Sequence, residues 1–230
     1  MKFLAVVAAR TGSSRFPGKV LFPIGGVPVL SLLIRRLSTS KKLDGILVAT
    51  TELAQDDEIE KTCQQENAEC FRGSEKDVLG RYAKAAKGSK DRRIIRITAD
   101  CPFVSGETLD PVLRQCEENP SFALVTTKPE YPRGIDYEVA PFQVIEELSN
   151  RATDPPDREH MFNYLYRHPL EFPIMRLPCP KALSSIKREF LLDTKEDLAS
   201  LEQSLGSLSP LEIHPSQMKC SRTFQNHSGI

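Results

Sequence analysis

Short apolar runs alternate with segments of helical periodicity through the first half of the chain. Five runs have the length of a β-strand, at residues 3–8, 46–49, 68–71, 94–97 and 122–125. Between them, apolar residues recur at intervals of three and four, as they do along one face of an amphipathic helix. Because strands that alternate with helices form βαβ units, we expect an α/β fold of three layers, with a mostly parallel sheet and helices on both faces.

Three of the predicted helices carry start signals. Pro28 suits the first position of a helix whose apolar face runs through residues 30–37. Ser74 and Asp77 resemble a capping pair ahead of the next helix, and Ser105 is a candidate N-cap for the one after it. The pattern therefore predicts where these helices begin as well as that they form.

The alternation changes after about residue 127. More than half of the chain's 17 prolines lie in the stretch 128–180. Proline removes a backbone donor and disfavours the interior of a sheet, so we expect this stretch to leave the sheet. Short helices are predicted within it, near residues 143–149 and 158–167.

Length bounds the number of domains. The 230 residues correspond to about one and a half domains of typical size. Helical order returns over residues 194–205, and the polar residues 209–230 contain two more prolines. We expect a single domain over residues 1–208, with 128–180 as a substrate-binding or subunit-pairing excursion and 209–230 as a loosely packed tail.

Charge and cysteine content argue against several classes of protein. The 31 basic and 31 acidic residues balance, whereas binding to nucleic acid or an anionic membrane needs a basic surplus. No apolar run approaches the roughly 18 residues of a membrane span, and Arg10 ends the apolar opening stretch too early for a signal peptide. The six cysteines include no C-x-x-C pair. We expect a cytoplasmic protein with reduced thiols and no nucleic-acid or membrane partner.

A polar, basic loop follows the first strand with the sequence Ala-Ala-Arg-Thr-Gly-Ser-Ser-Arg-Phe-Pro-Gly-Lys over residues 8–19. Ligands of α/β sheets bind beyond the carboxyl ends of the strands, and glycine and serine let backbone N–H groups approach phosphate oxygens. Cationic side chains add charge-assisted hydrogen bonds. A solvated basic turn would have a similar composition. The candidate nucleotide-binding residues are Ala8, Arg10, Thr11, Gly12, Ser13, Ser14, Arg15 and Lys19.

Two aspartates are candidate metal ligands. Asp100 directly follows the apolar run 94–97, so it faces the same sheet edge as the loop and could hold Mg²⁺ against phosphate oxygens. Asp193 begins the sequence Asp-Thr-Lys-Glu-Asp-Leu. Taken separately, Asp100 is equally typical of a turn before proline, and Asp193 or Thr194 is typical of a helix N-cap.

Taken in order, these motifs resemble the sugar cytidylyltransferases. The resemblance rests on Ala-Arg-x-x-Ser-x-Arg-Phe-Pro-Gly-Lys at residues 9–19, Asp-Cys-Pro at 100–102 and Asp-Thr-x-Glu-Asp-Leu at 193–198. It extends to the 3-deoxy-manno-octulosonate and acylneuraminate cytidylyltransferases. The spore-coat polysaccharide branch is more similar, through residues 71–82 and Arg-Glu-His at 158–160.

The resemblance implies the nucleotide-diphospho-sugar transferase fold and transfer of a nucleotidyl group from CTP to a sugar, with release of pyrophosphate. It implies catalytic roles for Arg15, Lys19 and Asp100, and Mg²⁺ held by Asp100 and Asp193. It places Arg72 and Ser74 near the base and ribose. It also implies a homodimer that serves the synthesis of surface polysaccharide or glycoconjugates.

The acceptor sugar is expected in the proline-rich stretch. Alternating residues put Asp136 and Glu138 on one face, where carboxylates could bind sugar hydroxyls. Arg158 or His160 could contact an acidic group, and Glu159 between them is a further candidate for substrate binding. A solvated ion-pair face would show the same pattern. At Ser14, Val20 and Cys101 the chain departs from the acylneuraminate and octulosonate patterns, so the motifs do not identify the sugar.

Two other functions are compatible with such a fold. A glycosyltransferase would consume a ready-made nucleotide sugar, but such enzymes usually carry an Asp-x-Asp motif, and Asp100 lies between Ala99 and Cys101. A nucleotide-binding regulatory protein without turnover would have no need of both aspartates. The motifs therefore favour the nucleotidyltransferase.

Overall fold

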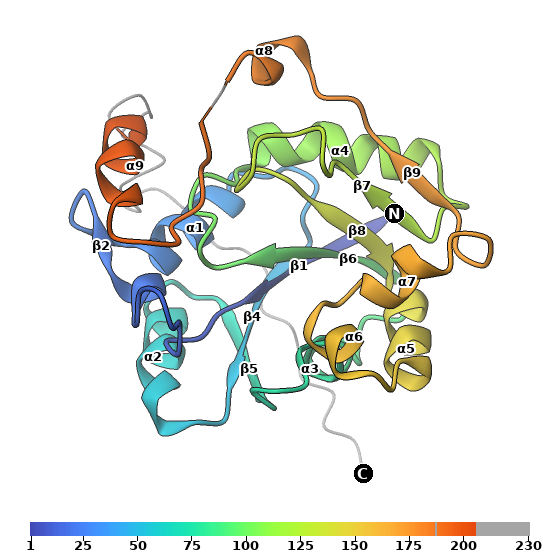
Figure 1. The fold of residues 1–230 in the computed structure, drawn as a ribbon, viewed down its shortest axis with the longest axis horizontal. Helices are drawn as coiled ribbons and strands as arrows, with labels where there is room; N and C mark the ends of the chain where they lie inside the picture. The colour runs from blue at the N-terminus through green and yellow to red at the C-terminus, as the bar shows by residue number, and fades with distance from the viewer. Residues whose placement is uncertain (187, 206–230) are drawn as a thin grey trace.

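A twisted sheet of seven strands forms the centre of the computed structural model, which describes residues 1–186 and 188–205 (Figure 1). The strands lie in the order β5-β4-β1-β6-β8-β7-β9. All pair in parallel except β8, which is antiparallel to both of its neighbours. Their bounds are β1 (Lys2–Ala8), β4 (Gly45–Thr51), β5 (Glu69–Gly73), β6 (Arg92–Thr98), β7 (Leu124–Thr126), β8 (Glu138–Pro141) and β9 (Ile174–Arg176). The expected α/β architecture is confirmed.

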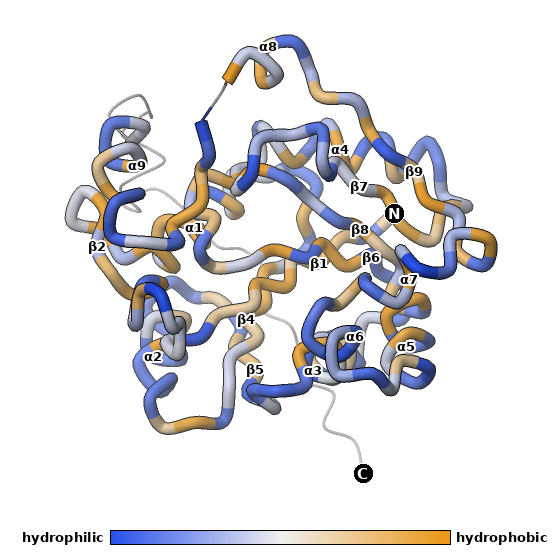
Figure 2. Tube along the Cα trace, viewed as in Figure 1, coloured by the Kyte–Doolittle hydropathy of each residue, from blue (hydrophilic) through white to orange (hydrophobic). Residues whose placement is uncertain are grey.

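Strand β1 shows how the apolar pattern builds three layers. Phe3, Ala5 and Val7 face one side, where they join the core under α1 (Val29–Leu37), α2 (Asp57–Gln65) and α4 (Gly106–Glu118). Leu4 and Val6 face the other side, under α3 (Val78–Ala85), α5 (Phe142–Arg151) and α7 (Asn163–Arg167). Apolar residues follow the central strands in Figure 2. Each such side chain contributes about 1.5–3 kcal/mol when it leaves water, so both helical layers are held by burial.

The helix start signals are confirmed at two of three positions. The Asp77 carboxylate accepts a hydrogen bond from Gly80 N at 2.9 Å and so caps α3, and Ser105 with Thr108 forms a capping box at α4. Contrary to the prediction, Pro28 is the N-cap of α1 and not its first helical residue. It ends the hairpin of β2 (Pro23–Ile24) and β3 (Val27–Pro28), and the helix begins at Val29.

The proline-rich stretch 128–180 does not leave the sheet entirely, contrary to expectation. Strands β8 and β9 return to it, because β8 has the apolar residues Val139 and Ala140 to bury on opposite faces. The helix predicted over 158–167 is divided into α6 (Pro155–Glu159) and α7.

The last described segments pack on the β2-β3 hairpin. Phe190, Leu192 and Leu201 share a small core with residues of the hairpin and of α1. Helix α9 (Asp197–Leu205) begins later than predicted, since the Asp197 carboxylate accepts hydrogen bonds from Asp193 N at 2.9 Å and Thr194 N at 2.7 Å. The predicted tail 209–230 lies outside the described residues. None of the helices that the structure describes is long and apolar enough to cross a membrane.

Candidate active site

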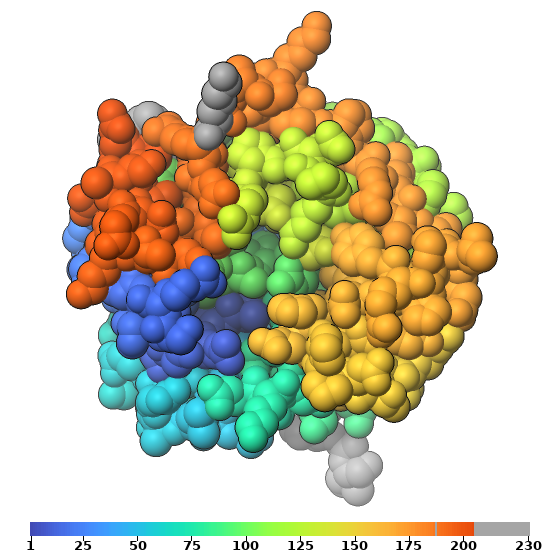
Figure 3. Space-filling view, in the orientation of Figure 1, coloured from blue at the N-terminus to red at the C-terminus, as the bar shows by residue number. Residues whose placement is uncertain are grey.

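A cleft of about 800 Å³ opens beyond the carboxyl ends of β1 and β6. It is the central hollow in Figure 3, bounded by segments that are far apart in the sequence. Most of the sequence-predicted residues meet there. Those that line the cleft are Ala8, Arg10, Ser13, Ser14, Arg15, Lys19, Asp100, Arg158, Glu159, His160 and Asp193.

Lys19 joins the two predicted metal ligands. Its Nζ lies 2.7 Å from Asp100 Oδ2 and 3.2 Å from Asp193 Oδ1, and its side chain is only 10% exposed. Arg15 forms a further ion pair with Asp193. Lys19 begins the short 3-10 helix η1 (Lys19–Leu21), preceded by Gly18 at a φ of 73°, which glycine adopts without strain. Two cations and two carboxylates thus form a compact, neutral cluster.

Asp56 fixes the start of the polar loop from beneath. It is fully buried at the end of the 3-10 helix η2 (Ala54–Asp56), and its Oδ1 accepts hydrogen bonds from Thr11 N at 2.8 Å and Thr11 Oγ1 at 2.6 Å. Its Oδ2 accepts from the Thr51 hydroxyl. The N–H and hydroxyl of Thr11 are therefore hydrogen-bonded within the protein. Contrary to the prediction, neither Thr11 nor Gly12 lines the cleft. Nothing in the sequence distinguishes Asp56 from its neighbour Asp57.

A strap, residues 190–193, carries Asp193 to the cleft. Leu192 N donates to Asp100 O at 2.9 Å, and Phe190 N donates to Arg133 O at 2.7 Å. The strap passes so close to Gly134, at a φ of +90°, that a Cβ there would lie 2.3 Å from the Phe190 carbonyl carbon. Backbone contacts between distant segments thus bring the two aspartates together.

A second group of charged residues lies around Glu75. Arg10 Nη1 is 3.9 Å from Glu75 Oε1, and Arg81 Nη1 donates to the backbone oxygens of Ser74 and Glu75. Burial lowers the pKa of Arg81, and the positive charge of Arg10 lowers it further. Nothing in the sequence marks Arg81 as a cleft residue, because an arginine within an amphipathic helix is usually on its exposed face.

Arg158 connects the α6 side of the cleft to α3. Its guanidinium donates to Ser149 O at 2.5 Å, to Ala152 O at 3.3 Å and to the Asp77 carboxylate. Burial raises the pKa of Asp77, but Arg158 and the Gly80 N–H outweigh it and hold the pKa below its usual value. Glu159 and His160 follow Arg158 along the cleft.

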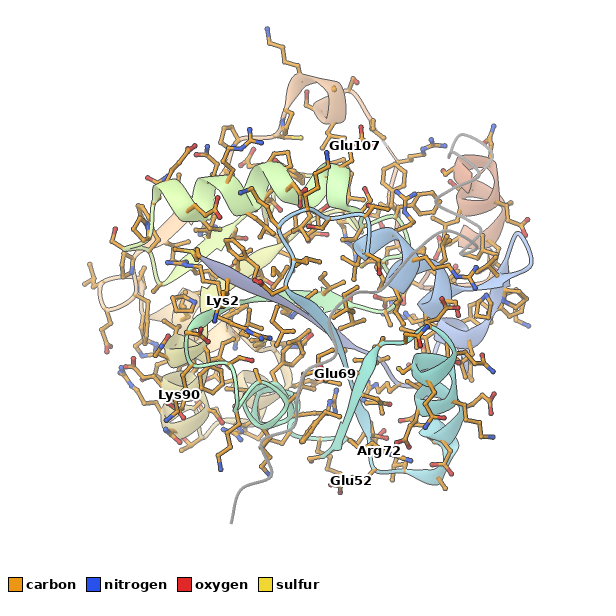
Figure 4. All side chains as sticks on the ribbon, turned by 180° about the vertical axis from the view of Figure 1, so that it is seen from behind. Lys2, Glu52, Glu69, Arg72, Lys90 and Glu107 are labelled. Atoms are coloured by element: carbon orange, nitrogen blue, oxygen red, sulfur yellow. The ribbon has the colours of Figure 1, made fainter. Side chains whose placement is uncertain are left out.

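Arg72 and Ser74 do not line the cleft. The Arg72 guanidinium donates to Thr51 O at 3.0 Å and Leu53 O at 2.9 Å, and it pairs with Asp57 at 2.7 Å. Figure 4 shows it between β5 and α2, at the edge of the sheet. The Ser74 hydroxyl instead accepts from Asp77 N at 3.2 Å.

Asp136 and Glu138 form an ion-pair face, as the alternative to sugar binding expected. This face is not solvated as that alternative supposed, because Glu138 is only 4% exposed. Lys128 Nζ lies 3.5 Å from Asp136 and 3.0 Å from Glu138, and Arg96 Nη1 lies 2.9 Å from Glu138. Tyr166 Oη donates to Glu138 at 2.8 Å. Burial raises the pKa of Glu138, but the two cations outweigh it and hold the pKa below its usual value. Neither carboxylate lines the cleft.

The donor set at Asp100 and Asp193 suits a hard divalent cation. Mg²⁺ is typically held by one or two carboxylates together with substrate phosphates and water. Both aspartates offer an oxygen within 3.2 Å of the same ammonium group, so the position between them already holds a cation. Among the described residues, no group of three or more His, Cys, Asp or Glu side chains could complete a metal site alone. The residues present therefore fit a metal ion that a phosphate ligand also coordinates.

Cys101 adds no ligand to this position. Burial raises the pKa of its thiol, and the neighbouring Asp100 charge raises it further, so the thiol stays protonated. Its Sγ lies 3.2 Å from Thr98 Oγ1.

The chain is similar in sequence and in structure to known proteins. A family model for cytidylyltransferases matches residues 4–222. An uncharacterized protein of Methanocaldococcus jannaschii is 38% identical over 197 residues, which cover 86% of this chain and 80% of that protein. The spore coat polysaccharide biosynthesis protein SpsF of Bacillus subtilis is 32% identical over 205 residues, covering 86% and 84%. A solved cytidylyltransferase structure from Leptospira borgpetersenii has a TM-score of 0.85 at 30% identity, covering 92% and 90%.

Proposed function

Because this chain belongs to the cytidylyltransferase family, we propose that it transfers a cytidylyl group from CTP to a sugar, in a reaction that requires Mg²⁺. The observation that carries the proposal is the Lys19 ammonium between Asp100 and Asp193, beside the loop of residues 10–19. Cations and carboxylates on one cleft suit a ligand with several phosphates and its metal ion.

The chemistry is a displacement at the α-phosphorus. A hydroxyl oxygen of the sugar forms a bond to phosphorus, the bond to the β-phosphate oxygen breaks, and pyrophosphate leaves while the hydroxyl proton is lost to solvent. Arg15 and Lys19 stabilise the charge that grows on the departing pyrophosphate. The backbone N–H of Ser14 holds the phosphates in line, whereas the Ser13 N–H donates to Thr11 O at 2.8 Å within the loop. When bound, Mg²⁺ would neutralise further charge on the phosphate oxygens.

Binding of the nucleotide would exchange the partners within the cluster. In the structure, Lys19 and Arg15 are paired with carboxylates. A triphosphate offers these cations a stronger set of oxygen acceptors, which releases Asp100 and Asp193 for the metal ion. No base is needed from either aspartate.

The acceptor is a sugar with an acidic group that Arg158 or His160 contacts, while the Glu159 carboxylate accepts a hydrogen bond from a sugar hydroxyl. Support comes from the position of these residues on the same cleft as the cluster. The product serves the synthesis of surface polysaccharide or glycoconjugates, which the name of the B. subtilis relative supports. Pairing into a homodimer and a cytoplasmic location stay predictions.

Pyrophosphate release tests the proposal. We expect release from CTP with Mg²⁺ only when a suitable sugar acid is present, and mass spectrometry should detect the CMP-sugar. Asp100→Asn should lower kcat by about 100-fold or more, since it weakens charge stabilisation in the transition state. Asp91→Asn is the matched control, because Asp91 pairs with Lys2 at the surface.

Three results would contradict parts of this proposal. Unchanged turnover in Asp100→Asn, with metal still required, would remove Asp100 from the metal site. Release of a nucleoside diphosphate from a nucleotide sugar would indicate a glycosyltransferase. Tight CTP binding without turnover across a broad panel of sugar acids would indicate a regulatory nucleotide-binding protein.

A further inference from the structure

Arg81 is a buried arginine on the cleft with hydrogen-bond donors that have no partner among the described residues. The residue is only 2% exposed, yet it lines the cleft. Both of its hydrogen bonds are made by Nη1, to the backbone oxygens of Ser74 and Glu75. Within the described part of the chain, Nε and Nη2 donate to no acceptor, and Nε is fully buried. Since buried donors are normally paired, this edge of the guanidinium indicates an acceptor supplied by a ligand.

The surroundings of Arg81 suit a neutral ligand group better than a phosphate. The Glu75 carboxylate, the Asp77 carboxylate and two backbone oxygens lie on this side of the cleft. Arg10 and Arg158 also line this side, but Arg10 lies beside Glu75 and Arg158 is paired with Asp77, so neither offers an uncompensated positive charge to a polyanion. In the part of the chain that the structure describes, no hydrogen bond or ion pair links Arg81, Arg10 or Glu75 to the cluster of Lys19, Asp100 and Asp193. The two groups of residues can therefore bind different parts of one ligand, with the triphosphate at Lys19 and another part at Arg81.

Apolar groups lie beside Arg81 along the cleft. Val78 and Tyr82 come from the same helix, Ala8 ends β1 and Ala9 follows it. The Tyr82 hydroxyl donates to Ile97 O at 2.9 Å, so its ring contributes apolar surface. A flat, neutral ring with acceptors along one edge would pack against the apolar groups and accept hydrogen bonds from the unpaired donors.

We propose that Arg81 is the residue that selects cytosine over uracil, an inference that rests on the proposed function. Cytosine presents two adjacent acceptors, O2 and N3, which match the parallel N–H groups of Nε and Nη2. The guanidinium group binds paired acceptors on a base in this manner elsewhere. Uracil carries an N–H at N3, which would face a donor, and arginine has no acceptor to offer.

The guanidinium is held in place before the ligand arrives. The aliphatic part of Arg81 packs across Gly73, where a Cβ would lie 3.2 Å from Arg81 Cγ. Nη1 is fixed by its two backbone acceptors. Little conformational freedom is therefore lost on binding. Arg72 is directed away and cannot take this role.

Titration calorimetry with Mg²⁺ and either CTP or UTP tests the proposal. We expect the wild type to prefer CTP, and Arg81→Met to lose about 10- to 100-fold in CTP affinity with little change for UTP, so that the preference disappears. Arg81→Lys keeps the charge but not the paired N–H groups, and it should lose the preference too. Lys84→Met removes an exposed cation from the same helix and should keep it.

Inorganic tripolyphosphate with Mg²⁺ serves as a probe of folding in the variants. Its affinity should be the same in wild type and Arg81→Met, because Lys19, Arg15 and the loop are untouched. If the wild type prefers CTP and both Arg81 variants keep that preference, the assignment to Arg81 is wrong while the proposed function stands. If the wild type does not prefer CTP, the cytidylyl proposal fails, and the assignment fails with it.

Discussion

At the scale of single residues, the site depends on buried side chains whose importance comes from their partners. Asp56 does not line the cleft, yet it holds the Thr11 backbone and hydroxyl and the Thr51 hydroxyl. Lys19 is nearly buried because two aspartates from distant segments surround its ammonium. In both cases an ionic group inside the protein is retained because every charge has an opposite or polar partner.

Asp56→Ala should destabilise the protein and weaken nucleotide binding together. Thr11 N and the Thr51 hydroxyl would lose their acceptor, at a cost of about 1–3 kcal/mol in the free energy of unfolding. The loop of residues 10–19 would lose its fixed start, so KM for CTP should rise. Urea denaturation and steady-state kinetics measure the two effects. The neighbouring Asp57→Ala, half exposed, is the control. Equal effects at the two positions would contradict an anchoring role for Asp56.

At the scale of elements, the strap at residues 190–193 closes the site. It is held by backbone hydrogen bonds to Asp100 and Arg133 and by apolar contacts of Phe190 and Leu192. Its close approach to Gly134 leaves no space for a side chain. The position of Asp193 is therefore set by how tightly two segments pack.

Gly134→Ala should displace the strap and lower kcat. The added Cβ would lie 2.3 Å from the Phe190 backbone, and the φ of +90° strains any residue with a Cβ. We expect a loss of about tenfold or more in kcat, because small displacements of groups that stabilise charge are costly. Gly88→Ala meets nothing within 4 Å and should match the wild type. Full activity in Gly134→Ala, with a normal melting temperature, would show that the strap tolerates movement.

At the scale of the whole molecule, β8 joins two parts of the sheet. It pairs with β6 on one side and with β7 on the other, so β7 and β9 are attached to the parallel strands only through it. Arg96 on β6 and Glu138 on β8 are register partners, and their side chains form an ion pair. An ion pair therefore lies where β8 joins the parallel strands to β7 and β9.

Acid should weaken the whole protein through Glu138. Its pKa is held below the ordinary glutamate value of 4.5, because Arg96 and Lys128 outweigh the effect of burial. The unfolded chain therefore binds the proton first, and the stabilisation by Glu138 is complete above about pH 4.5 and declines as the pH falls through the folded-state pKa. Urea denaturation from pH 3 to 7 should show a larger difference between wild type and Glu138→Gln at pH 7 than at pH 3. Glu69→Gln, exposed on β5, is the control. A difference that does not vary with pH would contradict this account.

Much of the fold was predictable because the signals are local. The alternation in β1 and the caps at Asp77 and Ser105 depend on residues close in sequence. Helix α1 begins one residue later than predicted, after Pro28, for a tertiary reason. The hairpin of β2 and β3 buries its apolar residues in a small core, so the backbone stays extended through the proline. The loop residues were predicted as site residues, together with Asp100 and Asp193, because the order of their motifs along the chain resembles that of the sugar cytidylyltransferases.

The sequence alone determined the layers of the fold and the chemistry of the loop, since apolar periodicity and residue type act over a few neighbouring positions. Only the tertiary structure decided which charged side chains face the cleft. Arg72 and Arg81 lie nine positions apart and carry the same guanidinium, yet distant carboxylates and carbonyls direct the first outward, while packing over Gly73 directs the second inward. A side chain takes its direction from partners that the fold brings to it, and those partners are far away in the sequence.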